Sequence, residues 1–288
     1  MRDRAGPRTL IGRAVATAVM TALAGLSIGV ASAQTLPPLP DSIKKHGLLR
    51  AGVKCDYPPD GFMDQAGKPV GVEIDVARHV AALAFGSPDK IEMTCVTAAN
   101  RIPSLVGGKI DLIIATLGIS DERKKVIDYS APYAWGGSDV LVLKDSKVKG
   151  LDDFKGKTVI TLKGAWQIGW FEKNLPEVNL LKLDNVSDGL QALLQGRADG
   201  YAHDLAVLQG IAQKNQRTRL VGELYQLGYR GVGFRKGETD WVAYVDAAVT
   251  KAKKDGIVTA SIKKYAEPDL VDATIESWDL AKVPSKSR

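Results

Sequence analysis

The chain has 288 residues, of which 25% are charged and 45% hydrophobic, and its formal net charge is +6 at pH 7. No stripe of basic residues interleaved with aromatic ones is present, so we expect no nucleic-acid partner. The histidines His46, His79 and His203 lack metal-ligand spacing, and the chain has neither a Gly-rich phosphate loop nor a G-x-S-x-G motif. We therefore expect no metal and no cofactor.

Residues 1–33 have the pattern of a secretory signal peptide. Ala14–Val30 is apolar, and Ala31–Ala33 fits the small-x-small pattern that precedes a cleavage site. An N-terminal membrane anchor is the alternative, but the apolar run is short and rich in alanine. We expect cleavage near Ala33 and an exported chain of about 255 residues, which suits two modest domains or one large one. The basic residues before the apolar run are Arg2, Arg4, Arg8 and Arg13.

In the first half of the chain, apolar runs that read as strands alternate with segments of helical periodicity. This alternation predicts βαβ units and a mostly parallel sheet. The expected elements are a strand at Leu48–Val53, a loop at Tyr57–Gly71, a helix at Ile74–Phe85, a strand at Ile91–Val96, a helix at Arg101–Val106 and a strand at Ile110–Ala115.

The same alternation starts again after Tyr133. The chain then returns through Arg230–Phe234, and the helices that follow are amphipathic and expected to pack on the first half. The expected elements are strands at Ser138–Leu143, Thr158–Leu162, Leu180–Leu183 and Ala198–Ala202, a helical turn at Leu151–Lys157, and helices at Ala165–Lys173, Ser187–Gln195, 205–214, Trp241–Asp255 and Ile257–Tyr265.

The two cysteines, Cys55 and Cys95, each follow an apolar run expected to form a strand, Leu48–Val53 and Ile91–Thr94. If those strands are neighbours, both thiols lie near one sheet edge. An even cysteine pair in an exported protein indicates a disulfide, and two buried free thiols are the alternative.

The segment Asn100–Tyr133 carries the clearest functional signal. The strand expected at Ile110–Ala115 is followed by Thr116, Gly118 and then Arg123. Open α/β sheets bind small ligands beyond the carboxyl ends of their parallel strands, and an arginine there can fork two hydrogen bonds onto a carboxylate. The segment predicts a small anionic or zwitterionic ligand.

The order of residues in this segment is also recognisable. It reads N-R-I-P-S-L-V-G-G-K-I-D, then A-T-L-G-I-S-D-E-R, then D-Y-S-A-P-Y, and an earlier segment from Gly71 to Val76 reads G-V-E-I-D-V. The pattern resembles the family 3 extracellular solute-binding proteins, which serve amino-acid uptake transporters of the ATP-binding-cassette (ABC) type. The resemblance covers roughly Leu48 to Tyr265 and departs from the family at Val72, where a larger residue is usual.

The resemblance implies an α/β fold, the two-lobed Venus-flytrap fold of periplasmic binding proteins, with mixed, mostly parallel sheets and two hinge crossovers. Lobe 1 would comprise residues 34–135 and 231–288, and lobe 2 residues 136–230. The protein would be a monomeric periplasmic receptor, not an enzyme, that captures an L-amino acid between its lobes and delivers it to a membrane permease.

The resemblance also assigns the groups that hold the amino acid. Arg123 would bind the α-carboxylate; the alternative is a solvated side chain in a charged run. Thr116 would offer a carbonyl or hydroxyl to the α-ammonium, and Gly118 keeps only a backbone N–H where the family often has a hydroxyl. Asp204, in a G-R-A-D-x4-D pattern, would bind the α-ammonium, or else cap the following helix.

Two further groups bear on the pocket. Gly164, Ala165 and Trp166 stand where the family has glycine and two hydroxyl residues; their backbone N–H groups remain available, and Trp166 either walls the pocket or is core. Lys54 and Arg101 match the basic residues that contact the side-chain carboxylate in glutamate/aspartate-type members, although a histidine of those members is Val186 here. Acidic and neutral polar ligands both stay open. Tyr57 would stack on the ligand, or is a loop aromatic.

A rival interpretation is an enzyme on the same fold. Some relatives of the family are cyclohexadienyl dehydratases, in which an added cleft carboxylate is the general acid, and Asp60 or Glu73 would be that group. A binding protein that serves a separate sensor is a third interpretation.

Overall fold

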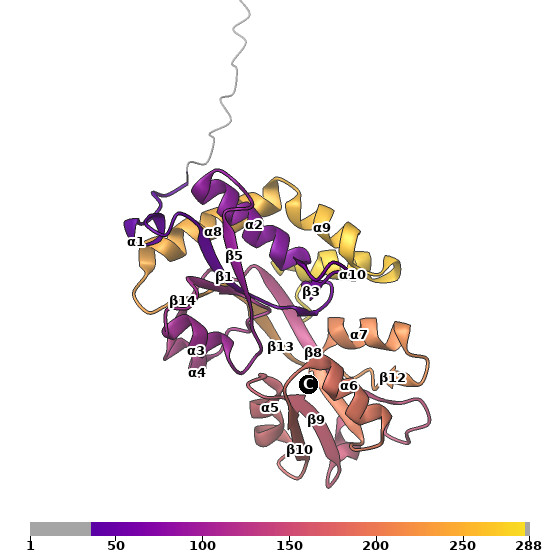
Figure 1. The fold of residues 1–288 in the computed structure, drawn as a ribbon. Helices are drawn as coiled ribbons and strands as arrows, with labels where there is room; N and C mark the ends of the chain where they lie inside the picture. The colour runs from indigo at the N-terminus through magenta and orange to yellow at the C-terminus, as the bar shows by residue number, and fades with distance from the viewer. Residues whose placement is uncertain (1–35, 286–288) are drawn as a thin grey trace, which may run out of the picture. The chain divides into compact units, whose positions relative to one another are not determined.

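The computed structural model describes residues 36–285, so the predicted signal peptide lies outside the described residues. One sheet, with the strand order β5-β1-β6-β14-β7, organises the part that we call lobe 1 (Figure 1). Its strands are β1 (Leu49–Val53), β5 (Ile91–Cys95), β6 (Leu112–Ile114), β7 (Ile127–Tyr129) and β14 (Gly233–Arg235). A small meander of β2 (Asp56–Tyr57), β3 (Gly61–Met63) and β4 (Pro69–Val70) accompanies it.

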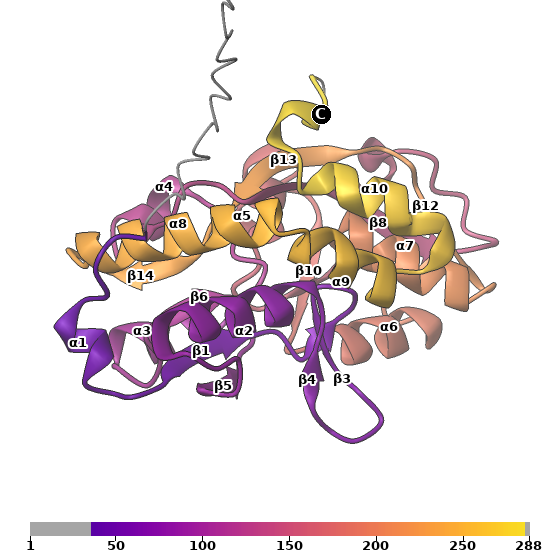
Figure 2. The same ribbon diagram turned by 90° about the horizontal axis from the view of Figure 1, so that it is seen from above.

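The helices of lobe 1 come from both ends of the described chain. They are α1 (Asp41–Lys44), α2 (Val72–Phe85), α3 (Arg101–Val106), α4 (Asp121–Lys124), α8 (Thr239–Lys254), α9 (Ile257–Tyr265) and α10 (Val271–Ser277), with short 3-10 turns at Pro268–Leu270 and Leu280–Lys282. Helices α8 and α9 pack against α2, as the sequence predicts (Figure 2). Ile74, Ala77 and Ala81 line the buried face of α2 and join the core that contains Trp241 of α8. Helical spacing thus places one apolar stripe against the core.

A second sheet, with the order β10-β9-β11-β8-β12 and β13 paired to β8, organises lobe 2. Successive residues such as Val140 and Leu141 enter separate apolar clusters on its two faces, because side chains alternate along a strand. The strands are β8 (Ala134–Leu143), β9 (Thr158–Leu162), β10 (Asn179–Leu183), β11 (Gly200–Asp204), β12 (Thr218–Leu220) and β13 (Tyr225–Arg230), and the helices are η1 (Leu151–Phe154), α5 (Gln167–Asn174), α6 (Val186–Leu194) and α7 (Leu205–Lys214).

The chain passes between the lobes along β8 and β13, which pair in antiparallel fashion. Trp135 is opposite Tyr229, and Ala134 is opposite Arg230. Gly231 then donates its N–H to the carbonyl of Leu117, so the returning chain lies beside the end of β6. Both passages therefore run next to the strand end that the sequence singles out for binding.

The two main sheets are mixed and mostly parallel, as the sequence predicts. In lobe 1 only β14 runs against its neighbours β6 and β7, and in lobe 2 only β8 runs against β11, β12 and β13. The structure corrects one strand boundary. The strand expected at Ala198–Ala202 begins later and includes His203 and Asp204.

Cys55 and Cys95 form a disulfide with a Cα–Cα distance of 5.5 Å. The neighbouring parallel strands β1 and β5 bring the two cysteines together, since Val53 is in register with Cys95. Closing a loop of 40 residues in this way stabilises a fold by about 2–4 kcal/mol. Within residues 36–285, no helix has both the length and the apolar character needed to cross a bilayer.

Candidate ligand-binding cleft

A cavity between the two lobes brings the predicted binding residues together. Its volume is about 30 Å³, room for about one or two water molecules. All the predicted ligand-binding residues except Gly164 line it. The Gly164 carbonyl accepts a hydrogen bond from one of the lining residues, Arg123. The lining residues are Lys54, Tyr57, Ala98, Arg101, Thr116, Gly118, Arg123, Leu162, Ala165, Trp166, Gln167, His203 and Asp204.

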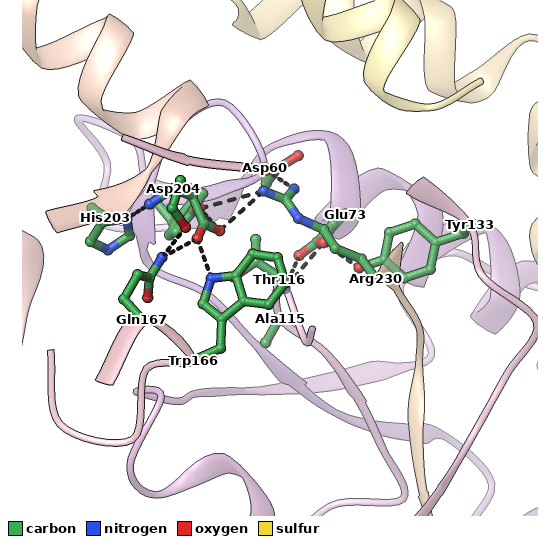
Figure 3. A network of polar contacts seen from close by, with 12 residues as sticks. Asp60, Glu73, Ala115, Thr116, Tyr133, Trp166, Gln167, His203, Asp204 and Arg230 are labelled. Carbon is green, nitrogen blue, oxygen red and sulfur yellow. Dashed lines mark hydrogen bonds and ion pairs between the residues drawn. The ribbon is translucent and has the colours of Figure 1, made fainter. Parts of the chain in front are cut away.

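Thr116, just after β6, has a backbone conformation that needs support. Its φ is 48°, which is uncommon for a residue other than glycine and costs about 1–3 kcal/mol unless its surroundings hold it. The support comes from Glu73 on α2, whose carboxylate accepts the Thr116 N–H at 2.9 Å and also accepts the Tyr133 hydroxyl (Figure 3). Burial, with the nearby charge of Asp60, raises the pKa of Glu73 to about 7. Glu73 thus acts behind the cavity and does not line it.

Arg123 is aimed from lobe 1 toward lobe 2. Ser120 caps α4 by accepting the N–H of Arg123, which fixes the start of this short helix. The guanidinium donates to the carbonyl of Gly118 at 2.7 Å and, across the cleft, to the carbonyl of Gly164 at 3.0 Å. Burial lowers the pKa of Arg123. The solvated-arginine alternative does not describe this position.

Arg101, at the start of α3, is 4% exposed. It donates to the carbonyls of Ala115 at 2.6 Å and Thr116 at 3.3 Å, and its Nε has no partner among residues 36–285. Burial, together with the charge of Arg123, lowers the pKa of Arg101 to about 10. The side chain therefore stays charged at neutral pH, and its hydrogen bonds go to neutral carbonyl oxygens.

Lys54 and Tyr57 enter the cavity from the segment after β1. Lys54 is 4% exposed and forms an ion pair with Asp56 at 2.7 Å, so its charge is already compensated. The Tyr57 hydroxyl donates to Asp204, and its ring packs with the apolar cluster of lobe 2. Tyr57 is therefore part of the contact between lobes rather than a loop aromatic.

Asp204 occupies the N-cap position of α7, yet its carboxylate makes no cap hydrogen bond. One oxygen accepts from Trp166 Nε1 at 2.9 Å and from Gln167 Nε2 at 2.7 Å. The other accepts from the Tyr57 hydroxyl and from Arg230 Nη2 at 3.3 Å (Figure 3). Burial opposes ionisation, but Arg230 and these donors hold the pKa of Asp204 below its ordinary value.

Arg230, at the end of β13, is a site residue that sequence reasoning did not identify. Its guanidinium lies between two carboxylates, donating to Asp60 at 2.7 Å and to Asp204 at 3.3 Å. Arg230 is 6% and Asp60 2% exposed. Burial raises the pKa of Asp60 despite the ion pair, and the carboxylates hold the pKa of Arg230 well above its ordinary value.

Trp166 lies across the cavity between two glycines. A Cβ on Gly118 would lie 3.1 Å from its indole, and one on Gly228 of β13 only 2.3 Å from it. Helix α5 begins at Gln167, not at Ala165 as expected, so Trp166 stands just before its first turn. The indole thus fits in this place because residues 118 and 228 have no side chain. No pattern near Trp166 in the sequence predicts this fit.

His203 is a second residue that the sequence analysis left out of the site. It is 5% exposed, and its Nδ1 accepts the N–H of Asp204 at 2.7 Å. Burial lowers the pKa of His203 to about 4, so the ring is neutral near pH 7. Across residues 36–285, no group of three or more His, Cys, Asp or Glu side chains is arranged to hold a metal ion.

Comparisons with known proteins agree with this geometry. Residues 49–268 match the model of the bacterial extracellular solute-binding proteins, family 3. A glutamine-binding protein of Geobacillus stearothermophilus is 39% identical over 198 residues, which cover 68% of this chain and 76% of that protein. The L-cystine-binding protein TcyJ of Escherichia coli K12 is 32% identical over 237 residues, covering 80% and 86%.

The fold is also that of solved structures. A crystal structure of a solute receptor for L-cysteine of Neisseria gonorrhoeae superposes with a TM-score of 0.75 at 33% identity, covering 77% of this chain and 91% of that one. The match of the family model spans well over half of the chain, and it includes both lobes. The chain belongs to the family 3 bacterial extracellular solute-binding proteins, the amino-acid receptors of ABC importers.

Proposed function

We propose that this receptor captures an acidic L-amino acid, glutamate or aspartate, between its lobes, which part to admit a molecule larger than the cavity of about 30 Å³. Arg123 binds the α-carboxylate and Arg101 binds the side-chain carboxylate. The observation that carries the proposal is a pair of guanidiniums, on buried Arg101 and half-buried Arg123, that line one cavity and hydrogen-bond to neutral groups within residues 36–285.

A buried charge is costly unless it is paired, and each of these guanidiniums has a pKa lowered by burial. Two carboxylates on one ligand compensate both cations at once, and a bidentate arginine–carboxylate contact is among the stronger polar interactions in proteins. A neutral amino acid supplies one carboxylate and leaves one of the two cations unpaired.

Lys54 has a smaller part in this proposal than the resemblance assigns to it. Its ammonium is paired with Asp56 at 2.7 Å, so the ligand is not needed to compensate it. The names of the three proteins compared above refer to glutamine, cystine and cysteine, all without a net charge, and other similar proteins are named for arginine and for glutamate. The acidic preference therefore rests on Arg101 and Arg123 in this chain and not on the relatives.

We propose further that the protein makes and breaks no bond. Asp60 and Glu73, the carboxylates that a dehydratase-like mechanism needs, do not line the cavity. Asp60 is paired with Arg230, and Glu73 supports the Thr116 backbone. The receptor would act as a monomer in the periplasm after cleavage near Ala33. On binding, residues 34–135 and 231–288 would close against residues 136–230, and the permease would recognise the closed form.

Isothermal titration calorimetry with four ligands tests the proposed specificity. Wild type should bind glutamate or aspartate more tightly than glutamine and asparagine. Arg101→Gln should reduce or reverse that preference by at least about tenfold, because it removes the charge that selects the side-chain carboxylate. Lys54→Met, which removes an already compensated charge, should change it less. Tight binding of neutral amino acids alone contradicts the acidic preference.

A further inference from the structure

The carboxylate of Asp204 has its hydrogen-bonding positions filled by the protein itself. A carboxylate offers about four lone-pair sites. Trp166 and Gln167 donate to one oxygen of Asp204, and Tyr57 and Arg230 donate to the other. An incoming ammonium group therefore has to displace a donor that is already in place.

The negative charge of Asp204 is compensated as well. Arg230 is buried between Asp204 and Asp60 (Figure 3). Its Nη2 also donates to the Tyr57 hydroxyl at 3.4 Å, and this hydroxyl donates to Asp204. This guanidinium occupies the role that the resemblance gives to the α-ammonium of the ligand. A buried cation already beside the carboxylate reduces the electrostatic gain from bringing a second one.

The two arginines of the cleft are in a different situation. Arg101 is 4% exposed, and its Nε has no partner within residues 36–285. The hydrogen bonds of Arg101 and Arg123 reach carbonyl oxygens and, for Arg123, the Tyr129 side chain, while Asp204 acts on both guanidiniums without a direct ion pair among the described residues. A ligand carboxylate would therefore meet two guanidiniums that have no direct ion pair, whereas a ligand ammonium would meet a carboxylate that already has one.

We infer that the two carboxylates of the ligand carry recognition and that its α-ammonium is dispensable, so the cleft also binds short dicarboxylates that lack an amino group. This inference rests on the proposed function, because it uses the same two arginines. It extends the ligand class from acidic amino acids to dicarboxylate anions of the same length.

Calorimetry on wild type with matched pairs of ligands tests the inference. The pairs are glutamate with glutarate and aspartate with succinate, which differ only by the α-amino group. We expect the dissociation constants within the tighter pair to agree within about tenfold. Glutarate and succinate more than a hundredfold weaker than their amino acids would overturn the inference while leaving the receptor function intact. Failure of every amino acid to bind would instead count against the proposed function.

A variant tests the role of Arg230 independently. Arg230→Gln removes the resident cation and frees Asp204 for an ammonium. The ratio of the glutarate to the glutamate dissociation constant should therefore be at least about tenfold higher in the variant than in wild type. Arg219→Gln is the matched control, because Arg219 on β12 donates to the carbonyls of Ser146 and Val148 and does not line the cleft. An unchanged glutamate-to-glutarate ratio in a folded Arg230→Gln protein contradicts the inference. If that variant does not fold, the wild-type comparison decides alone.

Discussion

Arg230 Nη1 lies 2.7 Å from Asp60 Oδ2, and both side chains are more than nine-tenths buried although 170 residues separate them in the chain. The pair joins β13 to the segment between β2 and β3 at the place where the chain crosses between lobes. Asp204 of lobe 2 approaches the same guanidinium at 3.3 Å. A single arginine therefore connects carboxylates from both lobes.

Removing Arg230 should destabilise the fold strongly. Arg230→Met leaves Asp60 and Asp204 buried without their cation, a type of change that costs about 3–5 kcal/mol. Urea denaturation of both proteins measures the difference. Lys251→Met is the control, because the Lys251–Asp255 pair is partly exposed and should contribute less than about 1 kcal/mol. Equal and small losses of unfolding free energy in the two variants would contradict a stabilising role for Arg230 between Asp60 and Asp204.

Glu73 should make stability depend on pH. Its pKa rises from an ordinary 4.5 to about 7 in the fold, with Asp60, Arg230, Tyr133 and Thr116 around it. The folded state therefore binds the proton more tightly than the unfolded state. This contribution is fully present below about pH 4.5 and is lost as pH rises through about 7.

Glu73→Gln tests the assignment. The amide is the neutral analogue of the protonated acid, so the difference in unfolding free energy between wild type and variant should change most between about pH 4.5 and about pH 7. The sign is fixed: wild type should lose stability relative to Glu73→Gln as pH rises. Denaturation curves at several pH values measure this, and a constant difference would contradict it.

Arg123→Ala should reduce amino-acid affinity. Losing a hydrogen-bonded charge partner for a buried carboxylate costs about 2–5 kcal/mol, or roughly thirty-fold to several-thousand-fold in dissociation constant. Lys124→Ala is the neighbouring control, since Lys124 is exposed and paired with exposed Asp121. Arg123→Lys should recover only part of the loss, because an ammonium cannot fork onto a carboxylate. Affinity of Arg123→Ala near that of wild type would end this assignment.

Trp166 and Gly228 should be coupled. A Cβ at residue 228 would lie 2.3 Å from the indole of Trp166, so Gly228→Ala forces the ring out of place. In a Trp166→Ala background the same substitution meets no indole and should cost less by about 1–3 kcal/mol of unfolding free energy. A double-mutant cycle by urea denaturation measures this. Additive effects on the unfolding free energy would show that contact with the Trp166 indole does not cause the cost of a side chain at residue 228.

The sequence predicted the parts of the site that depend on local patterns. Thr116, Gly118 and Arg123 follow one strand, and the rule that ligands bind beyond strand ends places them in the cleft. The elements α2, α3 and α9 also lie close to where their periodicity predicts them. Such features depend on neighbours within a few residues.

The parts that were missed depend on long-range contacts. Arg230 is a single charged residue in a glycine-containing segment, and only the fold brings it to Asp60 and Asp204. Gln167 likewise reaches Asp204 across 37 residues of sequence. Two missed contacts are local instead: His203 accepts the N–H of the next residue, Asp204, and Lys54 pairs with Asp56. Their geometry depends on how the fold buries these neighbours, and the sequence pattern does not show it.

Thermal unfolding of the exported chain with each of the twenty amino acids shows whether the cleft binds an amino acid. A ligand that binds only the folded state at a hundred times its dissociation constant stabilises by about 2.7 kcal/mol, which should raise the melting temperature by about 5–10 °C. We expect glutamate or aspartate to give the largest increase, ahead of glutamine and asparagine. If none of the twenty raises the melting temperature of the correctly folded protein, the amino-acid receptor account is wrong.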